Sequence, residues 1–332
     1  MKRKVALIGL GRIGWTLEKD PLRYHPCTHA GSLRSFEGLA DVVAICDIDP
    51  RHIHAFQKWW PAQRQTFKDF AAMIQALDRG QLDIDMAVVA TPQDVHTTQA
   101  IHLLKRNLKD VLIEKPPGEN RQQAIRIQKA WQDSSSRLWI NFERRYHPGY
   151  AKVKKLLHSQ NLGGVRSVRG RVFSGASPIH PGSGPLLHDA VHWLDLLFWF
   201  FDLPDSIKGI VQRDEKGLER SSHLLFQYRD FVATLETGAR SQYFEFEMEI
   251  DFERGRIHCG NQGFRLWKTA ASKRYSNFQE LKEASFPFKP GKRNPWKEMY
   301  SRILKGKADD YQKETALQGL KTVHYIHQAY RL

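Results

Sequence analysis

Cysteine is scarce in this chain of 332 residues, and its placement argues against two kinds of site. Cys27, Cys46 and Cys259 lack the close spacing of paired metal ligands and are too few for a disulfide framework. This usage is typical of proteins in a reducing compartment. We therefore expect a cytoplasmic protein without disulfides and without a bound metal ion.

The chain also lacks a long uninterrupted apolar run. The longest one, residues 186–201, is shorter than a membrane span of about 20 residues and contains His188, Asp189, His192 and Asp195. The first residues have the pattern of a β-strand and not that of a signal peptide. No membrane partner is expected.

Acidic residues are fewer than basic ones: 36 Asp and Glu accompany 51 Lys and Arg, which gives a formal charge of +15. The basic residues are spread along the chain in small groups without a nucleic-acid-binding motif around them. We interpret them as solvated surface, part of which attracts an anionic substrate or cofactor phosphates. No nucleic-acid partner is expected.

Apolar periodicity predicts an α/β chain of two domains with a boundary near residue 118. Short apolar runs first alternate with helical stretches, which is typical of a doubly wound parallel sheet; these runs are residues 5–8, 42–46, 86–90 and 111–113. Strand-like segments without intervening helices then indicate an antiparallel or mixed sheet: residues 165–173, 223–228, 231–236, 243–252, 256–259 and 264–267. Residues 243–252 alternate apolar with acidic side chains, so one face of that strand is expected to be buried. A helix is expected at about 311–330.

The most informative motif follows the first strand, residues 2–8. Gly9, Gly11 and Gly14 have the spacing that allows a tight turn, close approach of the backbone to a pyrophosphate and packing of the next helix. An ordinary strand-to-helix turn can carry the same glycines. Asp47 is the acidic residue expected on the ribose hydroxyls, but it lies 33 residues after Gly14, whereas about 20 residues are usual.

Lys115 follows the fourth strand, in the sequence Glu114-Lys115-Pro116-Pro117. In a doubly wound sheet this is the edge at which a nicotinamide lies, and a lysine there can donate a hydrogen bond to a substrate oxygen and assist its deprotonation. A surface lysine before a proline-stiffened turn explains the same residues equally well.

Residues 186–195 place ionisable side chains on an apolar segment. On one continuous helix His188, His192 and Asp195 share a face, and Asp189 also reaches His192. Such groups are costly in apolar surroundings unless they are paired, so the stripe is typical of a site, and histidine is a suitable general base near neutral pH. Mutual hydrogen bonding alone is one alternative. Metal binding by His188 and His192 is another, but no third ligand is identifiable.

Taken together, the ordered motifs resemble those of the Gfo/Idh/MocA oxidoreductases, named for glucose-fructose oxidoreductase and inositol dehydrogenase. They are GLGRIG, CDIDP, ATPQDVH, EKPP, NFERRYHP and HDAVHWLDLL, and they span most of the chain. The resemblance implies a Rossmann domain, here residues 1–118, followed by an α/β domain with an open, mostly antiparallel sheet over residues 119–332. The sheet face of such proteins often mediates oligomerisation, so a homodimer or homotetramer is expected.

The resemblance also implies roles for single residues. Lys115 corresponds to the lysine of the family's EKP motif, and His192 to the histidine that begins its H-x-x-D motif. His188 stands where relatives commonly have an aspartate, so the orienting group is either Asp189 or His188. The implied cofactor-binding residues are Gly9, Gly11, Arg12, Ile13, Gly14, Asp47, Thr91, Pro92, His96, Glu114 and Lys115, and Arg145 matches an arginine near the substrate.

The family pattern explains the long gap after Gly14. Relatives have a histidine and a small residue soon after the glycine motif, whereas the matching His29-Ala30 lies 15 positions after Gly14. We therefore predict an insertion at about residues 15–27 beside the cofactor. We expect Arg23, Tyr24 or His25 of this insertion to approach the active site. Tyr24 and His25 are the two candidate substrate contacts.

These residues predict an oxidoreductase that interconverts a secondary alcohol and a ketone on a small-molecule sugar, sugar derivative or cyclitol. NAD is the expected cofactor because the Asp47 carboxylate would repel the 2′-phosphate of NADP, although the nearby Arg51 leaves NADP as an alternative. Two other functions stay open. One is a redox-neutral lyase or glycosidase with tightly held NAD, and the other is a non-catalytic, cofactor-binding regulatory protein.

Overall fold

The computed structural model describes residues 2–159, 161–178, 183–288, 294–306 and 310–331. Contacts divide the chain into two compact units, Met1–Tyr146 with Arg293–Lys321 and His147–Lys292 with Thr322–Leu332. The boundary expected near residue 118 falls inside the first unit, because the strand Arg137–Ile140 (β6) still pairs with the first sheet.

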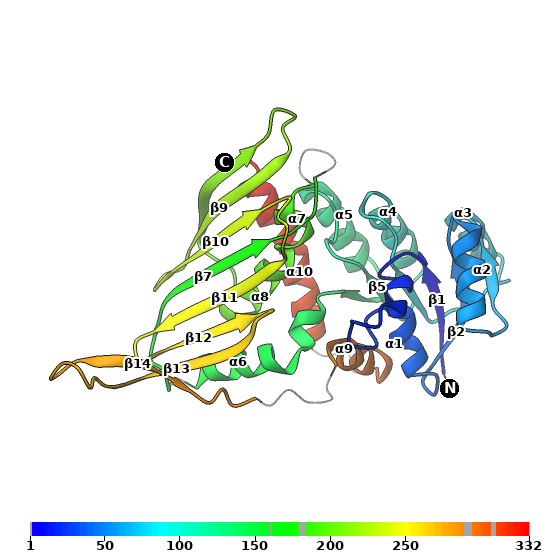
Figure 1. Ribbon diagram of the computed structural model, residues 1–332. Helices are drawn as coiled ribbons and strands as arrows, with labels where there is room; N and C mark the ends of the chain where they lie inside the picture. Colours follow the sequence, from blue (N-terminus) through cyan, green and yellow to red (C-terminus); the bar gives the residue numbers. More distant parts are fainter. Residues whose placement is uncertain (1, 160, 179–182, 289–293, 307–309, 332) are drawn as a thin grey trace. The chain divides into compact units, whose positions relative to one another are not determined.

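The first unit is built on a parallel six-stranded sheet in the order β3-β2-β1-β4-β5-β6 (Figure 1). With β6, its strands are β1 (Arg3–Ile8), β2 (Ala40–Cys46), β3 (Gln65–Phe67), β4 (Met86–Val89) and β5 (Asp110–Ile113). Every residue of β4 and β5 is buried, as expected of parallel strands covered on both faces. The predicted doubly wound parallel sheet is confirmed.

Helices flank this sheet and mostly begin at polar capping residues (Figure 1). The side chains of Thr28, Asp49, Asp69 and Asn120 accept hydrogen bonds from first-turn amides of α1, α2, α3 and α5. The helical elements are η1 (Thr16–Lys19), α1 (His29–Ser35), α2 (Pro50–Trp59), α3 (Phe70–Asp78), α4 (Gln93–Leu104), α5 (Arg121–Gln132), η2 (Glu143–Tyr146) and α9 (Pro295–Leu304). Although α9 lies far along the chain, its apolar side chains join the core formed with β1 and β2.

The second unit is built on an eight-stranded sheet in the order β14-β13-β12-β11-β7-β10-β9-β8 (Figure 1). Its strands are β7 (Val165–Phe173), β8 (Ser206–Arg213), β9 (Glu219–Gln227), β10 (Val232–Gly238), β11 (Glu245–Phe252), β12 (Gly255–Gly260), β13 (Gly263–Ala271) and β14 (Gln279–Ala284). β7 and β10 run parallel, and the other neighbouring pairs are antiparallel. The predicted second domain with a mostly antiparallel sheet is confirmed.

β11 has the alternation that its sequence predicts. Phe246, Met248 and Ile250 are at most 1% exposed. On the other face, Glu249 forms an ion pair with Arg169 of the neighbouring strand β7 at 2.5 Å. The apolar face therefore packs on the core, while cross-strand ion pairs line the polar face.

Helices cover the apolar face of this sheet; they are α6 (Pro148–His158), α7 (Pro185–His188), α8 (Val191–Phe201) and the end of α10 (Asp310–Ala329). Trp193 of α8 fits against β7 because Gly170 has no side chain, and a Cβ there would lie 2.2 Å from the indole ring. Phe198 packs on Tyr325 of α10, with ring centroids 5.1 Å apart. Among the helices that the structure describes, none is long and apolar enough to cross a membrane.

Candidate active site

The glycine turn after β1 has a backbone that only glycine tolerates well. Gly9 has a φ of +90°, and a Cβ there would lie 2.5 Å from the carbonyl oxygen of Ala90. A Cβ on Gly14 would lie 2.1 Å from the Gly9 carbonyl oxygen. At Gly11, chain neighbours aside, no described atom lies within 4 Å of the Cβ position, so the backbone there is open to a ligand.

This turn fits the pyrophosphate of a dinucleotide. The Gly11 carbonyl accepts from the amides of Trp15 and Thr16 (2.9 and 3.1 Å). Over the described part of the chain, the amides of residues 11–14 donate to no protein group. Backbone amides left open at the end of a strand are suitable donors for phosphate oxygens.

Asp47 reaches the glycine turn despite its distance in sequence. Its Oδ2 accepts a hydrogen bond from the Leu10 amide (2.6 Å), and its Oδ1 accepts one from the Asp49 amide (2.8 Å). Arg51 forms an ion pair with Asp49 at 2.7 Å. The acidic residue thus lies beside the turn, and the neighbouring arginine already has a carboxylate partner.

The residues of the predicted insertion form a loop between the turn and α1. The amides of His29 and Ala30, at the start of α1, donate to the carbonyls of Ile13 and Gly14 (3.1 and 3.0 Å). α1 therefore continues from the glycine turn in space, and residues 15–27 make a separate excursion. These two amides at the start of α1 already donate to the protein backbone, whereas the amides of residues 11–14 in the turn do not, within the described part of the chain.

One or more of Arg23, Tyr24 and His25 in this loop were expected to approach the active site. Desolvation, followed by the Glu143 carboxylate, raises the pKa of the Tyr24 phenol to about 12, although the residue is 60% exposed. His25 directs both ring nitrogens at oxygens of the loop, and Arg23 pairs with Asp20 at 3.2 Å. Of these three residues, Tyr24 is the one within electrostatic reach of the Glu143 carboxyl group.

A buried network fixes the backbone immediately before Lys115. The Glu114 carboxylate lies 2.8 Å from His29 Nε2 and accepts from Asn141 Nδ2 at 2.5 Å, and His29 Nδ1 lies 2.7 Å from the Tyr300 hydroxyl. Burial acts to raise the pKa of Glu114, but its contacts with His29, then with Asn141 and Lys115, outweigh burial and lower the pKa. Glu114 is therefore ionised at neutral pH, and these contacts hold the end of β5 in place.

Sequence reasoning did not single out His29, Asn141 or Tyr300 as site residues. His29 and Asn141 do lie in recognised segments, His29-Ala30 and NFERRYHP, so a polar residue in a family motif was an available signal. Tyr300 lies in α9, outside every motif, and only the folded chain brings it to His29.

Lys115 is half-buried and lies within electrostatic reach of a second carboxyl group, that of Glu143. Burial raises the pKa of Glu143, while the positive charges of Arg144 and then Lys115 oppose that rise. The ammonium group of a lysine has only hydrogen-bond donors, so Lys115 is suited to donating a hydrogen bond just after β5.

The predicted cofactor-edge residues lie at the start of α4. Pro92 is its N-cap residue, and Thr91 Oγ1 donates to Gln99 Oε1 at 2.5 Å. His96 is 1% exposed, and burial lowers its pKa, which favours the neutral ring. Of the three residues, Thr91 borders the glycine turn, because its amide nitrogen would lie 2.9 Å from a Cβ on Gly9.

Arg145, the predicted substrate contact, is buried. It is 2% exposed and donates from Nη1 to Gln318 Oε1 of α10 at 2.8 Å. Its guanidinium is therefore engaged inside the first unit.

The second unit carries the candidate histidines, and the continuous helix predicted for them is wrong. α7 ends at His188, and α8 begins at Val191. The amides of Asp189 and Ala190 both donate to the Pro185 carbonyl (3.1 and 2.9 Å), which closes α7 and interrupts the regular helical pattern. His188 and His192 therefore do not share one helical face, and the i, i+4 metal-binding alternative loses its basis.

His192 keeps polar neighbours on both sides of the interruption. Its amide donates to the Asp189 carbonyl at 3.3 Å, and Asp195, one turn further along α8, is 1% exposed. Asp189 itself lies 3.1 Å from His188 Nδ1, and the His188 side chain is 57% exposed. His192 is half-buried at the start of α8, as a residue that meets a substrate would be.

Glu219 of β9 holds the start of the segment that leads to these histidines. It is 1% exposed, and its carboxylate accepts from the Tyr330 hydroxyl (2.6 Å), the Thr237 hydroxyl (3.2 Å) and the Leu186 amide (3.3 Å). Burial raises the pKa of Glu219 to about 7, although these hydrogen bonds act to lower it.

This raised pKa predicts a loss of stability as the pH rises from about 4.5 to about 7. The carboxyl group holds its proton more tightly in the folded state, so the free energy of unfolding falls across that window, by about 3 kcal/mol at most. Glu219→Gln, which is neutral at every pH, is expected to remove this part of the dependence in urea unfolding. Glu283→Gln on the exposed strand β14 is the control; a slope that persists in Glu219→Gln would contradict the raised pKa.

The fold and the glycine turn define a dinucleotide-dependent oxidoreductase. Residues 3–142 match the oxidoreductase family with an NAD-binding Rossmann fold, and residues 150–258 match the GFO/IDH/MocA C-terminal domain. The chain belongs to the Gfo/Idh/MocA family, as its motifs predict. The predicted enzyme class, a dehydrogenase or reductase acting on CH–OH groups with a nicotinamide dinucleotide, is confirmed.

Known proteins similar to this chain act on carbohydrate-related compounds, by their names. An inositol 2-dehydrogenase of Salmonella typhimurium is 25% identical over 282 residues, which cover 82% of this chain and 76% of the relative. The WlbA dehydrogenase from Bordetella pertussis was solved with NADH and UDP-GlcNAcA and is 20% identical in sequence, with a TM-score of 0.74. The aligned region covers 100% of this chain and 96% of the WlbA chain. Levoglucosan dehydrogenase in complex with NADH is 14% identical, with a TM-score of 0.75; the aligned region covers 99% of this chain and 98% of the levoglucosan dehydrogenase chain. These two structures share the fold of this chain.

Proposed function

We propose that this enzyme interconverts a secondary alcohol and a ketone on a sugar, sugar derivative or cyclitol, with NAD as cofactor. The observation that carries the proposal is the position of Lys115, which directly follows β5 and the buried Glu114 network in the NAD-binding unit. The similar proteins named inositol 2-dehydrogenase and levoglucosan dehydrogenase support a polyol-like substrate.

In this proposal, His192 is the general base that takes the proton from the substrate hydroxyl. Lys115 donates a hydrogen bond to a substrate oxygen and stabilises the negative charge that develops on it. Asp189 or His188 orients His192. The bound nicotinamide supplies the hydride chemistry.

The substrate contacts in this proposal are Tyr24, Arg145 and His25, in that order of support. Tyr24 and Lys115 are both within electrostatic reach of the Glu143 carboxyl group. Arg145 and His25 have contacts inside the protein, which they would have to share with a substrate.

The cofactor preference in this proposal is for NAD over NADP. The residues that would hold the cofactor are Gly9, Gly11, Arg12, Ile13, Gly14, Asp47, Thr91, Pro92 and His96, with Glu114 and Lys115 at the end of β5. The carboxylate of Asp47 beside the turn disfavours a 2′-phosphate, and the ion pair with Asp49 leaves Arg51 less available to bind one.

The decisive experiment screens the purified enzyme against polyols, sugars and nucleotide-sugars with NAD and, separately, with NADP, while NADH or NADPH absorbance is recorded. We expect reduced cofactor to form with at least one polyol-like substrate, and faster with NAD than with NADP. Native mass spectrometry of the same sample reports any retained cofactor and the subunit count, which we expect to be two or four.

Two results would contradict this function. Product formation without net reduction of the cofactor would indicate a redox-neutral lyase or glycosidase. Tight cofactor binding without turnover across the whole panel would indicate a regulatory protein.

A further inference from the structure

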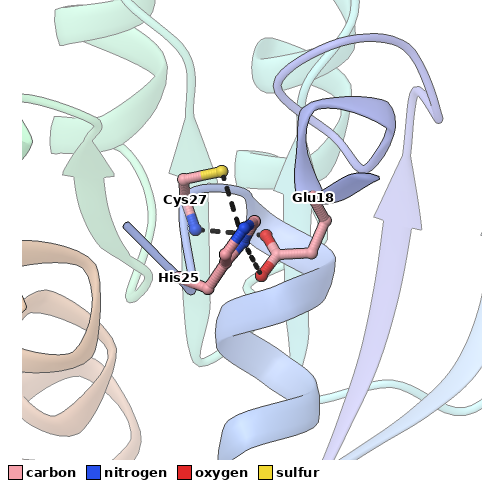
Figure 2. Close-up of side chains that lie close together, drawn as sticks. All are labelled: Glu18, His25 and Cys27. Atoms are coloured by element: carbon pink, nitrogen blue, oxygen red, sulfur yellow. Dashed lines mark hydrogen bonds and ion pairs between the residues drawn. The ribbon is translucent and has the colours of Figure 1, made fainter. Parts of the chain in front are cut away.

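The inserted loop brings three side chains with different ligand atoms to one point. Glu18 comes from η1, while His25 and Cys27 lie in the stretch that leads to α1, and Figure 2 shows all three converging. His25 Nδ1 lies 3.1 Å from Glu18 Oε1 and 3.9 Å from Cys27 Sγ. All three ligand atoms lie within 4.8 Å of one another.

The ring of His25 faces an oxygen on each side. Nε2 lies 3.0 Å from the Asp20 carbonyl oxygen, which can only accept a hydrogen bond, and Nδ1 lies 3.1 Å from the Glu18 carboxylate. A neutral imidazole has one N–H. When that N–H donates to Asp20, the lone pair of Nδ1 points at a carboxylate oxygen. In that tautomer, a metal ion between the two atoms makes their contact favourable.

The geometry is close to that of a zinc site. Zinc bound tetrahedrally by nitrogen, oxygen and sulfur holds these ligand atoms roughly 3.3–3.7 Å apart. The three atoms of this cluster need to move by roughly 1 Å to reach that arrangement. A set of imidazole, thiolate and carboxylate ligands favours zinc over magnesium or calcium, which prefer oxygen ligands.

The surroundings already orient the ligand atoms. The second oxygen of Glu18, Oε2, accepts from the Cys27 amide (3.1 Å) and the Thr28 hydroxyl (2.6 Å), which leaves Oε1 facing His25. In the tautomer that donates from Nε2 to the Asp20 carbonyl, His25 Nδ1 is the ligand atom. Such outer contacts are typical of metal-bound histidine and carboxylate. Gly31 of α1 leaves space for the cluster, because a Cβ there would lie 2.2 Å from the Glu18 carboxyl carbon.

We propose that Glu18, His25 and Cys27 bind one Zn²⁺ ion, with water as the fourth ligand. Binding releases the thiol proton of Cys27 to solvent, because the thiolate is the ligand form. The ion fixes the inserted loop to the start of α1, next to the glycine turn. Its role is to hold the loop, and the proposal does not depend on the substrate of the enzyme.

The test uses the full-length protein, purified without chelators or a histidine tag. Elemental analysis is expected to find about one zinc per chain in the wild type. After chelation, Co²⁺ is expected to restore a thiolate-to-metal charge-transfer band, and Zn²⁺ to raise the melting temperature. The His25 side chain is 39% exposed in the wild type. The His25→Ala variant should lose the bound zinc, the charge-transfer band and the rise in melting temperature on addition of Zn²⁺. Cys27→Ser should lose the charge-transfer band in particular.

His54→Ala, an exposed histidine on α2, is the matched control and should behave as the wild type. Zinc at background level together with no charge-transfer band in the wild type would overturn the proposal. Equal zinc content in His25→Ala and the wild type would place the metal elsewhere and would also overturn it.

Discussion

Replacing Lys115 by methionine is expected to lower kcat by about 10²–10⁴-fold, the usual loss when a positioned acid–base group is removed. Methionine keeps much of the length and apolar stem of lysine, but it has no charge and no N–H to direct at the substrate oxygen. The measurement is steady-state NADH formation with the substrate found by the screen. NADH binding, followed by fluorescence, is expected to change much less than kcat.

The matched control for this variant is Lys105→Met, which changes an exposed lysine at the end of α4 in the same unit. It should retain wild-type kinetics. Full turnover in Lys115→Met would show that the lysine after β5 has no part in the proton transfer, and a parallel loss of NADH binding and kcat would assign it to the cofactor instead.

His192→Ala is expected to reduce kcat for alcohol oxidation by a similar factor, about 10²–10⁴. The pH dependence of the rate tests the loss of a general base more specifically than the rate at a single pH does. The wild-type rate should rise with pH as the histidine loses its proton, and this limb of the profile should disappear in the variant. Added imidazole should restore part of the activity by occupying the space left by the ring.

His223→Ala, an exposed histidine on β9 of the same unit, is the control and should keep both the rate and the pH profile. If His192→Ala keeps the wild-type pH limb, another group is the base. If the rate falls but imidazole has no effect and the melting temperature drops, the role of His192 is structural.

The core strands of the first unit could be predicted from the sequence because each depends on residues that are close together in the chain. Gly9 needs a positive φ, and the buried strands β4 and β5 need continuous apolar residues. The sequence did not predict β3, because two of its three residues are exposed and it therefore has no apolar run. Short edge strands of this kind are specified by their neighbours more than by their own residues.

The candidate active site could be predicted from the sequence only in part. The sequence placed Lys115 after the fourth strand, but it placed His192 within a helix over residues 186–195 that was predicted to be continuous. Helical spacing gave no sign of the interruption, because Asp189 and Ala190 are both compatible with a helix. The interruption depends on where two amides find an acceptor, and both use the carbonyl of Pro185.

The sequence by itself determined the family and the Rossmann unit, because these follow from glycine spacing, apolar runs and ordered motifs; the insertion at about residues 15–27 stays a prediction. Only the tertiary structure decided that Asp47 lies beside the glycine turn, that Tyr300 supports His29 and Glu114, and that Glu18 meets His25 and Cys27. The physical reason is that local conformation is encoded by neighbouring residues. Contacts between distant polar groups depend instead on how complete elements pack, and no short stretch of sequence specifies that.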